Sequence, residues 1–273
     1  MTVKKFQQQI VSENGGILYL PPDPSLVLTD IPKIFEQSAT LLYPIGTRFV
    51  DGKVTYHYFK AGGTINYVLA GIFSNVAMLE SAVNTYGATL AGATTIKVDG
   101  ASAGVPAADA WAGGTILVIG AGSSERVMMR IVSNLAAETA SPYAVELTLE
   151  QPLPFDISND VNCEIMPNRY ASAITAWGDT LLGTMWTCIG IPARKMTANY
   201  YGWVKTWGMA FAARAGTDTT TDADRTVIWN TDGSIGPADE KWGPSTSYSH
   251  QLAGYALAIN GTAGGWFHMM CDP

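Results

Sequence analysis

Long apolar runs, basic runs and an apolar leader are all missing from this sequence. No stretch reaches about 18 consecutive apolar residues, the length that a membrane-spanning helix needs, so we expect no membrane span. Met1–Ser12 places lysines and glutamines where a secretion signal needs apolar residues, so no such signal is expected. The net charge of −7 and the lack of a Lys or Arg run disfavour a nucleic-acid partner, because phosphates would be repelled.

Cysteine and histidine are scarce, with three residues of each. Cys163, Cys188 and Cys271 lie far apart without a C-x-x-C pair, so the sequence predicts neither a disulfide framework nor a zinc site. This use of cysteine fits synthesis in a reducing cytoplasm. H-E-x-x-H is absent, and His250 and His268 are isolated, so neither a metallohydrolase nor the histidine of an acyl-transfer triad is indicated. We therefore expect no enzyme, cofactor or metal, although paired carboxylates for glycoside cleavage stay open, since their separation depends on the fold.

One glycine-rich stretch imitates a dinucleotide-binding loop. The apolar segment Thr115–Ile119 leads into Gly120 and Gly122, but Glu125 occupies the place of the third glycine, where a carboxylate would meet the pyrophosphate. The residues that follow alternate as a strand does, and no βαβ pattern appears. A strand, a glycine turn and a second strand explain this stretch better.

A cluster of acidic residues lies in the polar stretch Gly216–Thr226. Asp218, Asp222 and Asp224 lack the glycine and the terminal Glu of a calcium loop, so the spacing gives a bound cation no support.

The residues that are abundant favour strands over helices. Hydrophobic residues make up 47% of the chain and charged residues only 14%, with 28 glycines and 14 prolines. Together with many Thr, Val and Tyr residues, this composition favours short strands joined by turns, with apolar surface left for contacts between subunits. We expect a mainly β fold of antiparallel sandwich or barrel modules, an extended N-terminal arm and at most one or two short helices.

Four segments are expected along the chain. Residues 1–42, rich in proline, predict an extended arm. Residues 43–90 contain a hairpin region and a short helix, because Ser74–Asn84 carries Val76, Leu79 and Val83 at helical spacing. Residues 91–170 predict a sandwich or barrel-like module, and 171–273 a C-terminal β region. Period-two patterns predict strands at Thr94–Asp99, Thr115–Ile119, Arg126–Val132, Ala144–Leu149, Cys163–Met166, Tyr200–Trp207, Met209–Arg214, Gly254–Ile259 and Trp266–Met270.

The strongest local signal is a hairpin with Asp51-Gly52 at its turn, between Thr47–Val50 and Lys53–Phe59. Pairing Val50 with Lys53 would set Phe49 opposite Val54. One face would then hold Phe49, Val54, Tyr56 and Tyr58. The other face would hold Arg48, Lys53, Thr55 and His57, which makes His57 a solvent-facing strand residue.

Aromatic residues alternate along one predicted strand. Tyr201, Trp203 and Trp207, together with Lys205, lie on one side of it and form the candidate interface. Such a row is suited to a protein partner or to stacking on sugar rings. Burial in the core or in an interface is the favoured interpretation over glycan binding.

The order of several segments resembles virion structural proteins of environmental tailed phages. The segments that carry the resemblance are Tyr43–Gly63, Ala91–Val98, Leu147–Leu153, Met166–Tyr170 and Tyr200–Gly208. The family looks like capsid decoration, or cement, proteins, which implies shell binding without catalysis. The chain departs from this pattern at Gly264–Pro273, where a short aliphatic strand would be expected.

The resemblance implies a place on the outside of the phage head, after assembly in the host cytoplasm. The implied partners are the major capsid protein and further copies of the chain, in a homo-oligomer such as a trimer at a three-fold axis of the shell. A tail, baseplate or receptor-binding component that contacts a host glycan is the alternative. A carbohydrate-active enzyme is the third and least favoured hypothesis.

Overall fold

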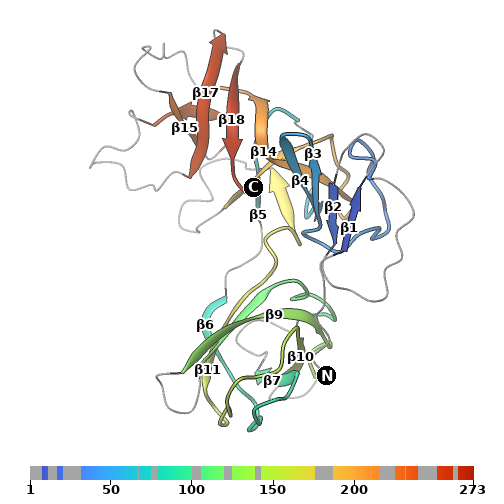
Figure 1. The fold of residues 1–273 in the computed structure, drawn as a ribbon, viewed down its shortest axis with the longest axis vertical. Coiled ribbons are helices and arrows are strands. Elements are labelled where there is room, and N and C mark those ends of the chain that lie inside the picture. The colour runs from blue at the N-terminus through green and yellow to red at the C-terminus, as the bar shows by residue number, and fades with distance from the viewer. Residues whose placement is uncertain are drawn as a thin grey trace. The chain divides into compact units, whose positions relative to one another are not determined.

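A computed structural model describes most of the chain, and the described residues contain strands and no helix. The mainly β class expected from the sequence is confirmed (Figure 1). Nowhere in the described ranges is there a helix of the length and apolarity that a membrane span requires. The described residues are 8–11, 17–20, 32–66, 68–74, 79–99, 106–119, 125–138, 143–175, 187–214, 225–230, 232–238, 251–260 and 264–273.

The chain divides into two compact units, one inserted in the other. The inserted unit is Val76–Asn168, and the host unit consists of Met1–Asn75 and Arg169–Pro273. This division differs from the four expected segments, since 76–90 belongs with the following module and the two ends of the chain form one body. Strand pairing between distant parts of the chain is the reason, and a local pattern does not reveal such pairing.

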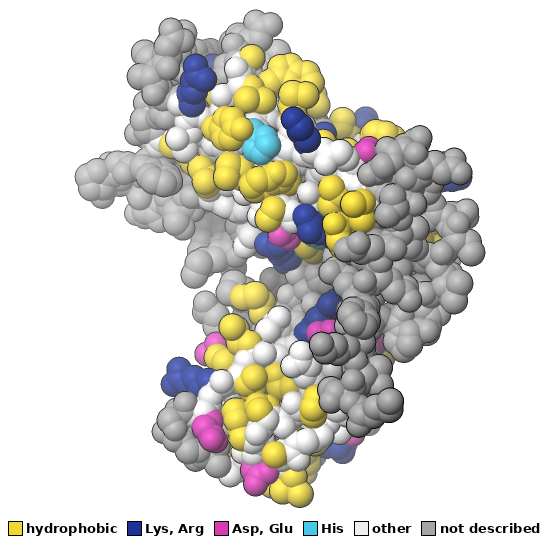
Figure 2. All heavy atoms as spheres, in the orientation of Figure 1, with side chains coloured by type: hydrophobic (Ala, Val, Ile, Leu, Met, Phe, Trp, Pro, Cys, Tyr) yellow, Lys and Arg dark blue, Asp and Glu magenta, His cyan; other side chains and the backbone are white. Residues whose placement is uncertain are grey.

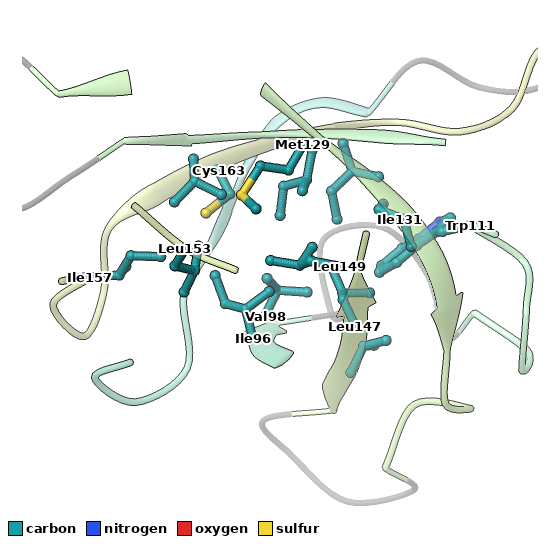
Figure 3. Packing of buried hydrophobic residues seen from close by; sticks show 14 of the residues in the cluster. Ile96, Val98, Trp111, Met129, Ile131, Leu147, Leu149, Leu153, Ile157 and Cys163 are labelled. Atoms are coloured by element: carbon teal, nitrogen blue, oxygen red, sulfur yellow. The ribbon is translucent and has the colours of Figure 1, made fainter. Parts of the chain in front are cut away.

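The inserted unit is a six-stranded antiparallel sheet in the order β6-β11-β8-β9-β10-β7. Its edge strands meet, because Thr85 bridges Val98 and the Tyr86 amide donates to the Lys97 carbonyl at 2.8 Å, so the sheet curls into a barrel. The barrel is filled by aliphatic side chains with Trp111 and Cys163 (Figure 3). The strands are β6 (Leu79–Asn84), β7 (Thr95–Asp99), β8 (Thr115–Ile119), β9 (Arg126–Asn134), β10 (Ala144–Leu149) and β11 (Asn162–Met166).

The helix predicted over Ser74–Asn84 is wrong where the structure describes that segment. Ser74 ends β5 (Ile72–Ser74), and Leu79–Asn84 forms β6, while 75–78 lie outside the described residues. Leu79 and Val83 are four residues apart, a spacing that fits both a helical turn and one face of a strand. Pairing with β11, in which Val83 lies opposite Cys163, decides in favour of the strand.

The host unit is a twelve-stranded sheet with the order β1-β2-β3-β4-β14-β18-β17-β15-β16, and β13, β5 and β12 branch from β14. Where residues 1–42 were expected to form an extended arm, β1 and β2 instead extend this sheet beyond β3, with Ile17 opposite Val50. The strands are β1 (Gln8–Val11), β2 (Ile17–Leu20), β3 (Arg48–Asp51), β4 (Val54–Lys60), β5, β12 (Ala173–Thr175), β13 (Cys188–Pro192), β14 (Tyr201–Ala212), β15 (Thr226–Trp229), β16 (Ile235–Pro237), β17 (Leu252–Asn260) and β18 (Gly264–Met270).

The predicted hairpin is present as β3 and β4, with a different register. Asp51 lies opposite Val54 and Phe49 opposite Tyr56, so Gly52 and Lys53 form the turn. Gly52 has a φ of 58° at the first central position, as two-residue turns that begin with glycine require. The register differs by a whole two-residue repeat, so the expected face survives: Phe49, Tyr56 and Tyr58 share a cluster with Tyr43 and Trp203, and Val54 packs against it.

His57 is buried, so its predicted position on a solvent face is wrong. Its Nδ1 lies 3.0 Å from Thr206 Oγ1, and its Nε2 lies 3.7 Å from Asp272 Oδ2. The same carboxylate accepts a hydrogen bond from Tyr170 Oη at 2.7 Å and pairs with Arg169. The C-terminal residues therefore cover this face of β4, a long-range contact that the hairpin sequence gives no sign of.

Candidate interaction face

The long strand β14 changes surroundings halfway along its length. Its first half pairs with β4 on one edge and β13 on the other, and its second half pairs with β18. In the second half, Ala210 and Ala212 are buried, with Phe267 and Met269 of β18 in the same core cluster. The large residues between the small ones consequently point to the opposite, uncovered side of the sheet.

Three adjacent strands contribute large side chains to this uncovered side. Cross-strand pairing places Trp207 opposite Met270, Met209 opposite His268 and Phe211 opposite Trp266. On the far side of β18, Tyr255 lies opposite His268. We call this surface the aromatic face, and it consists of Trp207, Met209, Phe211, Tyr255, Leu257, Trp266, His268 and Met270.

The rings of the aromatic face hold one another in place. Tyr255 stacks on His268, with centroids 5.1 Å apart and ring planes 14° apart, and Trp207 meets the same imidazole edge-on at 5.3 Å. Phe211 and Trp266 make a further edge contact at 5.4 Å. Such offset and edge-to-face contacts are favourable for aromatic pairs, so the surface is ordered before any partner arrives.

This face is apolar and well exposed. Met209 is 57% exposed, Leu257 48% and Trp266 47%, and Figure 2 shows hydrophobic side chains gathered around a histidine over β14, β18 and β17. None of the eight residues is Asp, Glu, Lys or Arg. At the rim, Lys205 Nζ donates to the Met209 carbonyl at 3.3 Å, and burial lowers the pKa of that ammonium. Exposed apolar patches with a polar rim mark contact surfaces.

The three residues of the predicted interface have different surroundings. Trp203 is 2% exposed and packs against Tyr43 and Tyr58 with centroids 5.3 and 5.1 Å away, so it belongs to the core and cannot meet a partner. Tyr201 is half-buried and stacks on Tyr58 at 6.1 Å. Of the three, Trp207 alone lies on the aromatic face, because the segment containing Ser38 and Tyr43 covers the first half of β14.

Sequence reasoning missed Tyr255, Trp266 and His268, although both of their strands were predicted. In β18 the alternation sets Trp266, His268 and Met270 against Phe267 and Met269, and both sets contain large apolar residues. The alternation of residues with a period of two therefore identified the strand but did not indicate which of its sides faces solvent. Pairing with Ala210 and Ala212 on the buried side supplies that information.

Within the described ranges no three His, Cys, Asp and Glu side chains gather closely enough to hold a metal ion. The acidic stretch with Asp218, Asp222 and Asp224, and also His250, lies outside those ranges. The glycine-rich stretch that resembles a dinucleotide-binding loop lies between β8 and β9, and these two strands pair as a hairpin with Ile119 opposite Arg126.

Comparisons of the chain with protein-family models, curated proteins and solved structures find no match.

Proposed function

We propose that this chain is a structural protein of a tailed-virus particle that decorates the outside of the capsid and stabilises it by contact, without catalysis. The sequence segments that resemble phage decoration proteins support this proposal, and so do the all-strand fold and the aromatic face. The partners in this proposal are the major capsid protein and further copies of the chain.

The observation that carries the proposal is the aromatic face itself. Ring contacts hold Trp207, Phe211 and Trp266 in place on adjacent paired strands. Binding a partner would therefore cost little side-chain conformational entropy. Burying one large apolar side chain contributes about 1.5–3 kcal/mol. Several such residues on each copy would give the lasting attachment that a cement protein needs, particularly when copies bind together.

A tail or receptor-binding role is the second candidate, and the exposed rings favour it in one respect. Trp266 is 47% and Tyr255 44% exposed, and both present ring surface on which a sugar could stack. In this case the ligand would be a host glycan, and the protein would occur in few copies per particle.

Binding to particles that lack the protein tests the proposal. We expect the purified chain to cosediment with such heads and a Trp266→Ala/Met209→Ser variant to bind at least tenfold more weakly. Met128→Ala is the matched control, because Met128 is 75% exposed on the inserted unit and lies outside the aromatic face. Hundreds of copies per particle by quantitative mass spectrometry would support decoration. A handful of copies at the tail, with glycan binding that Trp266→Ala abolishes, would support the second candidate instead.

A further inference from the structure

Two of the three cysteines, distant in the sequence, meet in the core of the host unit. Cys188 begins β13, and Cys271 follows the last residue of β18. Both strands approach the same edge of β14: Ile191 pairs with Lys205, and the Cys271 amide donates to the Thr206 carbonyl at 3.0 Å. Cys188 belongs to an apolar cluster against which Cys271 packs, and each side chain affects the protonation of the other.

The two sulfurs have unequal surroundings. Cys188 is fully buried, and the side-chain amide of Gln251 holds its backbone, accepting from the amide at 2.6 Å and donating to the carbonyl at 3.0 Å. Cys271 is the more exposed residue and lies in the short segment after the last strand. An oxidant would therefore reach Cys271 first.

The surroundings of Cys271 favour its thiolate. The donor groups of Cys188 and of the Trp229 indole near the sulfur, together with the charge of Arg169, lower the pKa of Cys271, although burial and Asp272 oppose this. Trp229 Nε1 is buried and has no hydrogen bond of ordinary length to the described residues, so a negative sulfur would satisfy it. Burial raises the pKa of Cys188 well above its ordinary value, so that sulfur keeps its proton.

We propose that Cys188 and Cys271 are a redox-active dithiol, which peroxide converts into a disulfide that fastens the C-terminal segment to β13. The Cys271 thiolate attacks one oxygen of hydrogen peroxide, the O–O bond breaks, and a sulfenic acid and hydroxide form. The Cys188 thiol then gives up its proton and attacks the sulfenic sulfur, the S–O bond breaks, and water leaves. Two thiols and one peroxide thus yield one disulfide and two waters. This chemistry does not depend on the proposed attachment to a shell.

The test is peroxide treatment of the reduced full-length protein, followed by alkylation, intact mass and peptide mapping. We expect loss of two thiols, loss of the mass of two hydrogens, and a peptide pair joined through Cys188 and Cys271. The melting temperature should rise on oxidation and return on reduction. Cys163→Ser should behave as wild type, since Cys163 is buried in the barrel of the other unit. Cys188→Ser should instead accumulate sulfinic acid at Cys271.

Three outcomes of that experiment contradict the proposal. The first is the absence of a disulfide in wild-type protein after peroxide treatment. In that case either both thiols are retained, or Cys271 carries sulfinic acid while Cys188 can still be alkylated after unfolding. The second is a crosslink that includes Cys163. The third is a disulfide between copies of the chain, seen as a dimer on a non-reducing gel. All three readouts use wild-type protein, so the proposal does not depend on the folding of a variant.

Discussion

His57 stacks flat on Tyr170, with ring centroids 4.8 Å apart and ring planes 6° apart. His57 belongs to β4, before the inserted unit, and Tyr170 follows directly after it. Asp272, close to the C-terminus, contacts both side chains. Three distant parts of the host unit therefore meet at one buried imidazole, which makes the protonation of that ring matter for folding.

Acid should destabilise the protein through His57. Burial lowers the pKa of His57 from 6.5 to about 4, against the opposing effect of Asp272. The unfolded chain takes up this proton near its ordinary pKa and the folded chain only near pH 4. The stability contributed by the neutral ring is therefore complete above the ordinary pKa and is lost as the pH falls towards 4, by about 3 kcal/mol in all. Urea unfolding across this range measures the loss.

His57→Gln is the control for this acid effect. Glutamine keeps a polar contact for Thr206 and does not titrate, so the variant should be less stable at neutral pH but should show a flatter dependence on pH. Parallel loss of stability in wild type and variant would assign the acid effect to the carboxylates instead.

Two tryptophans four residues apart on β14 should respond very differently to truncation. Trp203→Ala should cost about 3–5 kcal/mol of unfolding free energy, because it empties the centre of a buried aromatic cluster. Trp207→Ala should stay within about 1 kcal/mol, because its indole is only partly covered. Urea denaturation of the two variants measures both values. Equal costs would mean that the aromatic face is covered within the monomer.

Gly254 should tolerate no side chain. Its φ is 145°, and a Cβ there would run into the His268 carbonyl oxygen on the paired strand. We expect Gly254→Ala to cost more than about 2 kcal/mol, since neither the conformation nor the space suits alanine. Gly52→Ala is the matched control: its φ is 58° with no atom within 4 Å of the new Cβ, so it should cost only about 1 kcal/mol. A smaller cost at Gly254 than at Gly52, measured by urea denaturation, would contradict this ranking.

The inserted unit should fold by itself. Each of its six strands pairs within the unit, and its buried aliphatic residues form a cluster of their own. We expect a fragment covering Val76–Asn168 to show strand-type circular dichroism and a single cooperative urea transition. A gradual, non-cooperative loss of signal would mean that the barrel needs the host unit.

Much of the fold was predictable because strands leave a local mark. Thr115–Ile119 and Ala144–Leu149 were placed with the bounds that the structure has, since both are short segments with β-branched and other apolar residues between turn residues. Tyr200–Trp207 and Met209–Arg214 were predicted as two strands and form one, β14, in which Gly208 with its φ of 100° is accommodated within the strand. A glycine thus looked like a break where the strand continues.

The errors concern contacts between distant residues. The burial of His57 depends on Asp272, more than two hundred residues further along, and the core position of Trp203 depends on Tyr43. The meeting of Cys188 with Cys271 was equally invisible, because spacing alone carries no information about pairing across a sheet. The aromatic face was missed for the opposite reason: β18 is apolar on both sides, so alternation could not mark the outer one.

The place of the insertion has a consequence for variation between related chains. In the host unit the chain leaves after β5 and returns before β12, and these strands pair, with Ala173 opposite Ser74. In the inserted unit the first and last strands, β6 and β11, also pair, with Leu79 opposite Ile165. In each unit the strands next to the connections are therefore neighbours. Evolution or protein engineering could exchange, duplicate or delete the barrel, and a short linker would then join β5 to β12 in the remaining sheet.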